Sequence, residues 1–192
     1  MRTEHIAAVL LAAGSSSRFG EEDKLLADYR GKPVIQNSLE TVSSMAFGEL
    51  IAVVRPLDQA PVIHRKLERR GFTILVNDQP DEGISGSIVR AISHVMTSGR
   101  SRGVLICLGD MPDVPSTHYN RICMAAQDVR SLVASTDGFS ASPPAFIGRK
   151  HFPELLKLRG DQGARALLSQ AIQIEASEGS LRDIDTPADI PE

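Results

Sequence analysis

The sequence predicts an α/β fold with a mostly parallel central sheet, helices on both faces and a single domain spanning residues 1–192. Short apolar runs alternate along the chain with segments of helical spacing, which is typical of parallel strands joined by crossover helices. The apolar runs are continuous rather than alternating with polar residues, which indicates strands covered on both faces. The length suits one domain, and the apolar fraction of 42% suffices for a buried core.

Six apolar runs are expected to form strands, and they span 5–13, 49–55, 72–78, 103–110, 131–136 and 172–176. Apolar residues recur at helical spacing between them, in 33–45, 61–70, 85–98 and 116–129. Pro33 fits the start of the first helix, Ser85 or Gly86 the start of the third, and Ser116 or Thr117 can cap the fourth.

The last quarter of the chain differs in character. Segment 142–152 contains two prolines and a glycine and is assigned no helix or strand. Two short helices are expected within 151–158 and 162–171, and 181–190 reads as a loop that opens a terminal turn.

Composition disfavours several classes of protein. The net charge of −3 provides no overall basic field for nucleic acid or membrane binding, and every apolar run is shorter than the ~20 residues of a membrane helix. Cys107 and Cys123 lie in apolar runs and read as buried hydrophobes, which suits a reducing cytoplasm. The first strand starts close to the N-terminus, so no cleavable leader is expected. The five histidines show no ligand spacing and read as surface or structural residues.

Two polar strand ends locate a candidate site. In open α/β sheets, ligands bind outside the carboxyl ends of the strands, where the strand order reverses. The first and fourth strands commonly flank that point, and here they end in LAAGSSSRFG and LGDMPDVP. We therefore expect these two ends to face each other across a ligand site.

The loop after the first strand has the residues of a polyphosphate site. Gly14 permits close backbone approach, and Ser15 and Ser16 add donors for phosphate oxygens. Arg18 and Lys24 supply fixed cations. The Walker and dinucleotide fingerprints are both missing, which disfavours a nicotinamide oxidoreductase. The alternative is an ordinary strand-to-helix turn with solvated side chains.

Carboxylates follow the fourth strand and recur near the C-terminus. Asp110 sits where it could hold a hard cation such as Mg²⁺, although an aspartate there can also cap a turn. Asp113 is the better candidate for that cap. Asp185 or Asp183 could place a second carboxylate on the same metal, although Thr186 and the proline after it also read as a helix start.

Two further loops could contact a ligand. Segment 77–87 precedes the most regular predicted helix and could close on a base or ribose, or could be only a capped turn. In GDQGARAL, Asp161 can cap a helix, and Arg165 either faces solvent or reaches an anionic substrate.

LAAGSSSRFGEEDKLL resembles the LAAGxSxRxGxxKxL signature of the nucleotidyltransferases related to molybdopterin guanylyltransferase. GKPVIQNSL, GISGSI, GDMPDV, GDQGARALL and LRDIDTPADI look like its molybdenum cofactor cytidylyltransferase branch, and the match spans nearly the whole chain. Three departures stand out: Ser142 where the family usually has glycine, Phe19 where methionine is commoner, and no tryptophan near QPDEGIS. The first leaves the identity of the acceptor open.

The resemblance implies a Rossmann-like nucleotidyltransferase fold that uses CTP and Mg²⁺. The acceptor would be molybdenum-loaded molybdopterin, whose terminal phosphate attacks the α-phosphate while pyrophosphate leaves. Catalysis would depend on Lys24, Arg18 and Asp110, and the metal on Asp110 and Asp185. Ala13, in LAAG rather than LAGG, favours CTP, with GTP as the other candidate. The implied nucleotide-binding residues are Leu11, Ala12, Ala13, Gly14, Ser15, Ser16, Arg18, Lys24, Asn77, Gly83, Ser85, Ser87 and Asp110, and the implied acceptor-binding residues are Ser142, Pro144, Asp161 and Arg165.

Two alternatives stay open. One is a cytidylyl- or other nucleotidyltransferase acting on a sugar or polyol phosphate, which fits the first loop equally well. The other is a protein that binds the pterin cofactor and hands it to a molybdoenzyme or its maturation chaperone. The presence of both Lys24 and Asp110 argues against binding alone.

Overall fold

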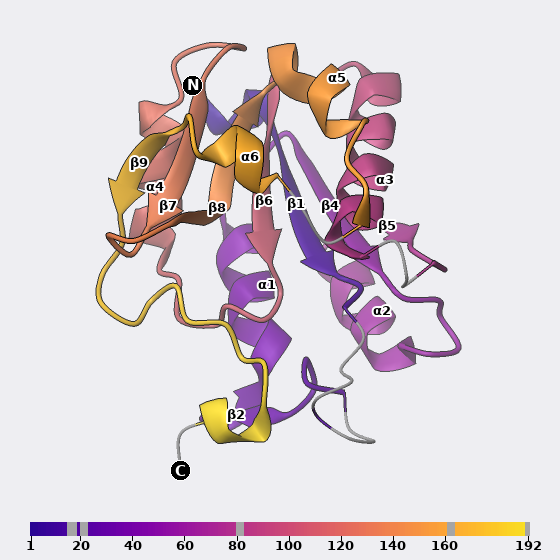
Figure 1. Ribbon diagram of the computed structural model, residues 1–192. Coiled ribbons are helices and arrows are strands. Elements are labelled where there is room, and N and C mark those ends of the chain that lie inside the picture. The colour runs from indigo at the N-terminus through magenta and orange to yellow at the C-terminus, as the bar shows by residue number, and fades with distance from the viewer. Residues whose placement is uncertain (15–18, 20–22, 80–82, 161–163, 191–192) are drawn as a thin grey trace.

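Seven strands form the central sheet: β1 (Ile6–Ala12), β4 (Glu49–Val54), β5 (Thr73–Val76), β6 (Gly103–Leu108), β7 (Leu132–Thr136), β8 (Ala141–Gly148) and β9 (Ile172–Glu175). The computed structural model describes residues 1–14, 19, 23–79, 83–160 and 164–190. The strand order is β5-β4-β1-β6-β8-β7-β9 (Figure 1). A separate two-stranded sheet joins β2 (Asp28–Tyr29) to β3 (Lys32–Pro33).

The sheet is mostly parallel, as the alternating sequence pattern predicts. β1 pairs in parallel with β4 and β6, β4 with β5, and β7 with β9. β8 runs antiparallel to both of its neighbours, β6 and β7. All six expected strands are present, with no end shifted by more than two residues.

β8 occupies the proline-containing segment, to which the sequence pattern assigned no element. Its second half carries Ala145, Phe146 and Ile147, which are buried and pair with β6. Pro143 and Pro144 lie where the register with β7 shifts between Ala134 and Ser135. Prolines cannot donate to the ladder, so a strand tolerates them at such an irregularity. The apolar residues after the prolines therefore decide the structure of this segment.

The helices cover both faces of the sheet (Figure 1). The core on one face includes residues of α1 (Val34–Ser44), α2 (Pro61–Glu68) and α4 (Ser116–Ala125). The core on the other face includes residues of α3 (Gly83–Ser98), α5 (Phe152–Leu155) and α6 (Arg165–Leu168). Among the described residues, no helix combines the length and the apolar character needed to cross a bilayer.

The ends of α3 and α4 differ from the prediction. α3 begins at Gly83 instead of Ser85 or Gly86. Neither Ser116 nor Thr117 caps α4, whose N-cap is Pro115. α4 ends at Ala125 instead of 129, and the amides of residues 127 and 128 donate to the hydroxyl of Ser131 instead of to helical carbonyls.

β1 is an interior strand between β4 and β6, and side chains along it and at its end alternate between the two cores. Leu10 and Ala12 pack in one core, while Leu11 and Ala13 pack in the other. The carboxyl ends of β1 and β6 adjoin, and the amide of Gly109 donates to the carbonyl of Leu11 at 2.9 Å. A Cβ at Gly109 would lie only 3.3 Å from that carbonyl oxygen, so glycine permits this close approach.

Candidate active site

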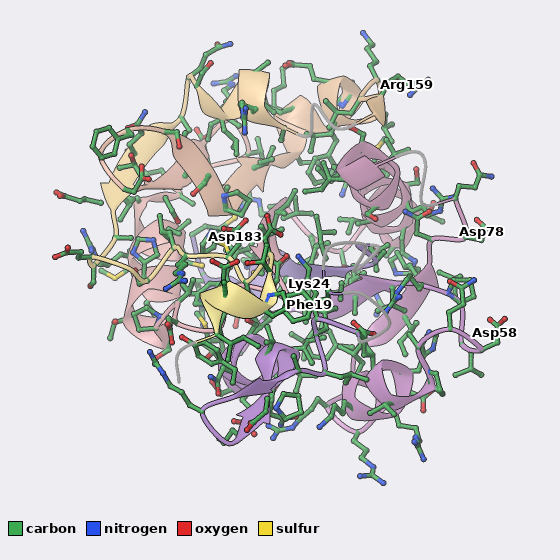
Figure 2. All side chains as sticks on the ribbon, turned by 60° about the horizontal axis from the view of Figure 1, so that its bottom comes forward. Phe19, Lys24, Asp58, Asp78, Arg159 and Asp183 are labelled. Atoms are coloured by element: carbon green, nitrogen blue, oxygen red, sulfur yellow. The ribbon has the colours of Figure 1, made fainter. Side chains whose placement is uncertain are left out.

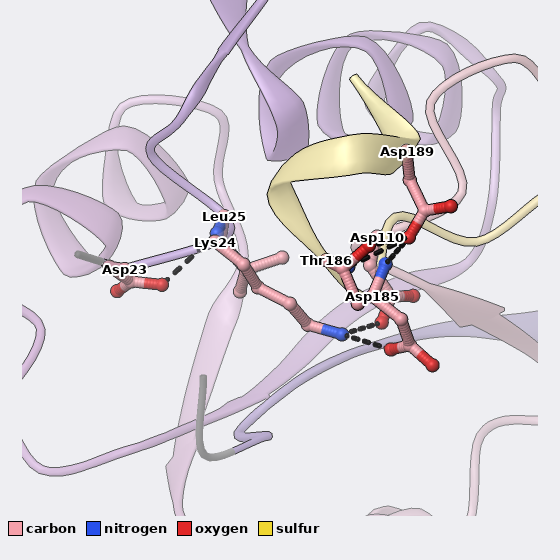
Figure 3. A network of polar contacts seen from close by, with 7 residues as sticks. All are labelled: Asp23, Lys24, Leu25, Asp110, Asp185, Thr186 and Asp189. Carbon is pink, nitrogen blue, oxygen red and sulfur yellow. Dashed lines mark hydrogen bonds and ion pairs between the residues drawn. The ribbon is translucent and has the colours of Figure 1, made fainter. Parts of the chain in front are cut away.

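Lys24, Asp110 and Asp185 meet at the carboxyl edge of the sheet (Figure 3). The Lys24 Nζ donates to Asp110 Oδ2 at 2.7 Å and to Asp185 Oδ1 at 3.0 Å. The three residues come from the segment after β1, from the end of β6 and from the C-terminal loop. Their meeting confirms that the polar ends of the first and fourth predicted strands face each other.

The charges at this point are partly withdrawn from solvent. The side chain of Lys24 is 12% exposed and that of Asp110 is 21% exposed. Burial alone lowers the pKa of Lys24, but the Asp110 and Asp185 carboxylates outweigh this effect and raise the pKa above its ordinary value. Lys24 is therefore a stable cation near neutral pH. Ion pairs at such partly buried positions are screened less by salt than exposed pairs.

The C-terminal loop places two aspartates beside Lys24. Ile184 is buried, and its amide donates to the carbonyl of Asp110 at 2.9 Å. On either side of Ile184, Asp185 pairs with Lys24 and Asp183 lines the adjoining pocket. Burial raises the pKa of Asp183, and the Asp185 and Asp110 carboxylates raise it further. Figure 2 shows Lys24 and Asp183 near the centre of this face, whereas Asp58, Asp78 and Arg159 project from the periphery.

Asp189 holds the backbone that carries Asp185. Its Oδ2 accepts from the amides of Asp185 at 3.1 Å and Thr186 at 2.7 Å, and from the Thr186 hydroxyl at 2.9 Å. These bonds, the Thr186 hydroxyl first, lower the pKa of Asp189 to about 2. The predicted helix start is confirmed, since Thr186 and Asp189 form a capping box around a 3₁₀ turn, Pro187–Asp189. The turn and Asp185, which pairs with Lys24, thus belong to one structure.

A pocket of about 350 Å³ adjoins this cluster. Its walls contain most of the residues that the sequence assigned to nucleotide binding, namely Leu11, Ala13, Gly14, Asn77, Gly83, Ser87 and Asp110, together with Ile84, Leu108 and Asp183. The Asn77 amide donates to the Ser87 hydroxyl at 3.0 Å, which ties the loop after β5 to α3. Gly83 begins α3 with a φ of 60°, a conformation that glycine adopts without strain.

Other expected residues lie elsewhere. The side chain of Ala12 packs in the core on the opposite face of the sheet. Ser85 is buried outside the pocket lining, and its hydroxyl has no partner among the described residues. Ser15, Ser16, Arg18 and Asp161 lie outside the described residues.

A second cavity, of about 180 Å³, lies beside the first and shares Ile84 with it. Ser142 and Arg165, which the sequence assigned to the acceptor, both line it. Pro144 follows Pro143 through a cis peptide bond, and its carbonyl accepts from the buried Ser135 hydroxyl at 2.7 Å.

Asp113 does not cap the next helix. Its carboxylate accepts from the Tyr29 hydroxyl and from Arg30 at 3.1 Å. Asp113 thus fastens the loop after β6 to the small β2–β3 sheet.

Asp23 and Arg55 form a site-adjacent ion pair that we did not predict. Arg55 directly follows β4, and β4 is a sheet neighbour of β1. The rule that ligand sites gather at carboxyl strand ends could have drawn attention to it.

The carboxylates fit a divalent ion that arrives with a polyphosphate. Asp110 and Asp185 converge on one point, and Asp110 Oδ1 is buried without a hydrogen-bond partner among the described residues. Within the part of the chain that the structure describes, no three His, Cys, Asp or Glu residues form a metal-binding group. Mg²⁺ commonly binds through one or two carboxylates and the substrate phosphates. The arrangement suits that mode and not an all-protein cage.

This architecture defines the class: an open α/β protein with a pocket at the carboxyl ends of adjacent parallel strands, where ligands of such sheets commonly bind. The family follows from comparison with known proteins. Residues 8–176 match the MobA-like NTP transferase domain, and the chain belongs to this nucleotidyltransferase family.

The proteins that are similar to this chain in sequence carry different names. PucB, a purine catabolism protein of Bacillus subtilis, is 28% identical over 97% of this chain and 95% of its own. Nicotine blue oxidoreductase of Paenarthrobacter nicotinovorans is 27% identical over 94% and 92% of the two chains. A probable molybdenum cofactor guanylyltransferase of Thermococcus sibiricus is 36% identical over 54% of this chain and 47% of its own.

Solved structures show the same fold. Rv0371c of Mycobacterium tuberculosis superposes with a TM-score of 0.79 at 26% identity, covering 98% of this chain and 96% of the other. A structure of Rv0371c in complex with manganese superposes with a TM-score of 0.75 at 24% identity, covering 96% and 95%.

Proposed function

We propose that the protein transfers a nucleoside monophosphate from a nucleoside triphosphate to the terminal phosphate of a molybdopterin-type acceptor and releases pyrophosphate. The observation that carries this proposal is the convergence of Lys24, Asp110 and Asp185 beside a pocket lined by the β1 end and the start of α3. Nucleotidyl transfer needs in-line positioning and charge neutralisation more than covalent help, and this cluster can supply both.

Each part of the site has a proposed role. Lys24 and, from the same loop, Arg18 hold the triphosphate by charge. The space beside Gly14 is open, since a Cβ at this position would meet nothing within 4 Å, and this space would accommodate the phosphates. Asn77 and Ser87, which are hydrogen-bonded to each other, orient the base or ribose.

Asp110 and Asp185 are proposed to hold Mg²⁺. The bound ion would neutralise charge on the phosphates during transfer. Lys24 lies between the two carboxylates here, and its flexible four-carbon stem would let its ammonium reach the triphosphate instead if Asp110 and Asp185 held the ion. The manganese complex of Rv0371c supports a divalent ion in this fold.

The identity of the nucleotide base and that of the acceptor are both proposed from the resemblance to the molybdenum cofactor nucleotidyltransferases. Ala13 lines the pocket and favours CTP, whereas relatives named molybdenum cofactor guanylyltransferase favour GTP. Ser142, Pro144, Asp161 and Arg165 are proposed for the acceptor, and two of them line the second cavity. We place the reaction in the cytoplasm, where a molybdoenzyme or its chaperone would receive the product.

One incubation series tests this function. Purified protein is mixed with Mg²⁺, molybdenum-loaded molybdopterin and either CTP or GTP, and the product is identified by mass spectrometry. We expect a pterin–cytosine dinucleotide and pyrophosphate. A guanine product would overturn the base assignment, and transfer only to sugar or polyol phosphates would overturn the acceptor. Tight pterin binding with no product from any nucleotide would favour the delivery protein.

A further inference from the structure

We propose that Arg55 is a positioning residue, which holds Lys24 in place through an ion pair with Asp23. The Arg55 Nη2 pairs with Asp23 Oδ2, and the two side chains are only 17% and 15% exposed. The catalytic consequence of this pair rests on the proposed function, because Lys24 is assigned there to the triphosphate.

Asp23 closes a turn around Lys24. Its Oδ1 accepts from the Leu25 amide at 3.1 Å, and its carbonyl accepts from the amides of Leu26 at 2.8 Å and Ala27 at 3.2 Å (Figure 3 shows the first of these bonds). The side chain and backbone of Asp23 therefore both fix the turn from which the lysine extends. A carboxylate that Arg55 also grips cannot leave this turn without breaking a partly buried ion pair.

Arg55 is itself fixed from two sides. It directly follows β4, whose register with β1 extends to the pair of Ala12 and Val54. Its carbonyl lies 2.8 Å from Nε2 of His64, a buried residue of α2. Since a carbonyl only accepts, Nε2 carries the proton and donates. A continuous path of contacts thus runs from α2 through the end of β4 to Asp23.

Lys24 needs such an anchor because of its own chemistry. Its side chain is a flexible four-carbon stem, so the backbone decides where the ammonium can reach. Here the ammonium must reach two carboxylates contributed by distant segments.

Amide hydrogen exchange without nucleotide tests the anchor itself. We compare Arg55→Ala, Arg55→Lys and Asp23→Asn with Arg70→Ala, which removes an arginine from an exposed pair with Glu40. We expect Arg55→Ala to speed exchange in a peptide covering 24–29, Arg55→Lys to restore part of the protection, and Arg70→Ala to change nothing there. Unchanged protection of β6 would show that the fold is intact. Unchanged exchange at 24–29 in Arg55→Ala would overturn the proposal.

Steady-state pyrophosphate release tests the consequence for Lys24. Misplacement of a reacting group can cost about 100-fold in rate, so we expect Arg55→Ala and Asp23→Asn to lower kcat/KM alike, by about 10- to 100-fold. Since both remove one interaction, the double variant should be no worse than either single variant. Arg55→Lys should recover part of the loss.

Two results would overturn this role. One is faster exchange at 24–29 with normal kcat/KM. The other is a loss of kcat/KM in Arg55→Ala that far exceeds the loss in Asp23→Asn, with the two losses adding in the double variant. That pattern would mean that Arg55 contacts the nucleotide directly. If the wild type released no pyrophosphate with any triphosphate, the proposed function would fail, and the exchange result alone would decide whether Arg55 anchors Lys24.

Discussion

Lys24 and Asp110 are 86 residues apart in sequence, yet the lysine ammonium and the aspartate carboxylate are 2.7 Å apart. The contact joins the two loops that follow the adjacent strands β1 and β6. A second carboxylate, that of Asp185, accepts a hydrogen bond from the same ammonium at 3.0 Å. The candidate site is therefore a three-residue charge cluster beside a pocket.

Lys24→Ala should lower kcat/KM by about 100- to 1,000-fold, the usual cost of losing a group that stabilises developing charge. The secondary structure should persist, because the lysine side chain is not part of either hydrophobic core. Pyrophosphate release and circular dichroism measure the two effects. The control is Lys157→Ala, an exposed lysine with the same charge. Equal activity in both variants would contradict the role of Lys24.

Asp110→Asn should raise the Mg²⁺ concentration needed for half-maximal activity, because an amide oxygen is a weaker ligand for Mg²⁺ than a carboxylate. Chelation should abolish activity in the wild type, and added Mg²⁺ should restore it. Asp58→Asn is the matched control, since Asp58 lies in an exposed turn at the periphery of the same face (Figure 2). An unchanged Mg²⁺ dependence in Asp110→Asn would remove Asp110 from the metal site.

Asp189→Asn should reduce stability at neutral pH but not in strong acid. The pKa of Asp189 is about 2 in the folded protein and about 3.9 when unfolded. A depressed carboxyl pKa stabilises the fold above the unfolded value, and this contribution is lost as the pH falls through the folded value. Urea unfolding of both proteins from pH 5 to pH 2 should show the difference shrinking between about pH 4 and pH 2. A difference independent of pH would contradict the capping network.

Ser87→Leu should raise the KM for the nucleoside triphosphate, because Ser87 lines the larger pocket and the added methyl groups occupy it. The substitution also removes the partner of the Asn77 amide. Ser93→Leu makes the same change on the exposed side of α3 and should leave the KM unchanged. Isothermal titration with a non-hydrolysable triphosphate measures the affinities. Equal affinity in both variants would place the nucleotide elsewhere.

Ala13→Gly tests the base preference separately. Ala13 is the residue on which the assignment of CTP depends, and its side chain lines the pocket. We expect the glycine variant to raise the ratio of GTP to CTP turnover. Competition between equal concentrations of the two nucleotides measures that ratio, and an unchanged ratio would remove Ala13 from base selection.

The fold was predictable where the sequence pattern is strong. Continuous apolar runs identified β1, β4 and β6, and the rule for carboxyl strand ends paired the loops of Lys24 and Asp110. β8 was not predictable in this way. Its two adjacent prolines argue against a strand, and the apolar residues after them form one because they pair with β6. Local signals cannot show which partner a segment finds across the sheet.

The charged residues of the candidate site were predictable from the sequence, but the residues that hold them in place were not. Lys24, Asp110 and Asp185 follow from motifs, whereas Asp23 and Asp189 depend on contacts formed only in the folded chain. Asp189 forms a capping box with the predicted cap Thr186, and its bonds also set the backbone of Asp185. Arg55 lies 32 residues from Asp23, and only the sheet order brings them together.

The central claim is that the Lys24 cluster moves a nucleotide onto a phosphate acceptor. Its most direct test uses CTP labelled at the α-phosphorus, with Mg²⁺ and molybdenum-loaded molybdopterin. We predict that the label appears in the pterin product, that the released pyrophosphate is unlabelled, and that Lys24→Ala loses nearly all transfer. Label that stays in CTP, or that reaches the pterin equally well in Lys24→Ala, would contradict the account.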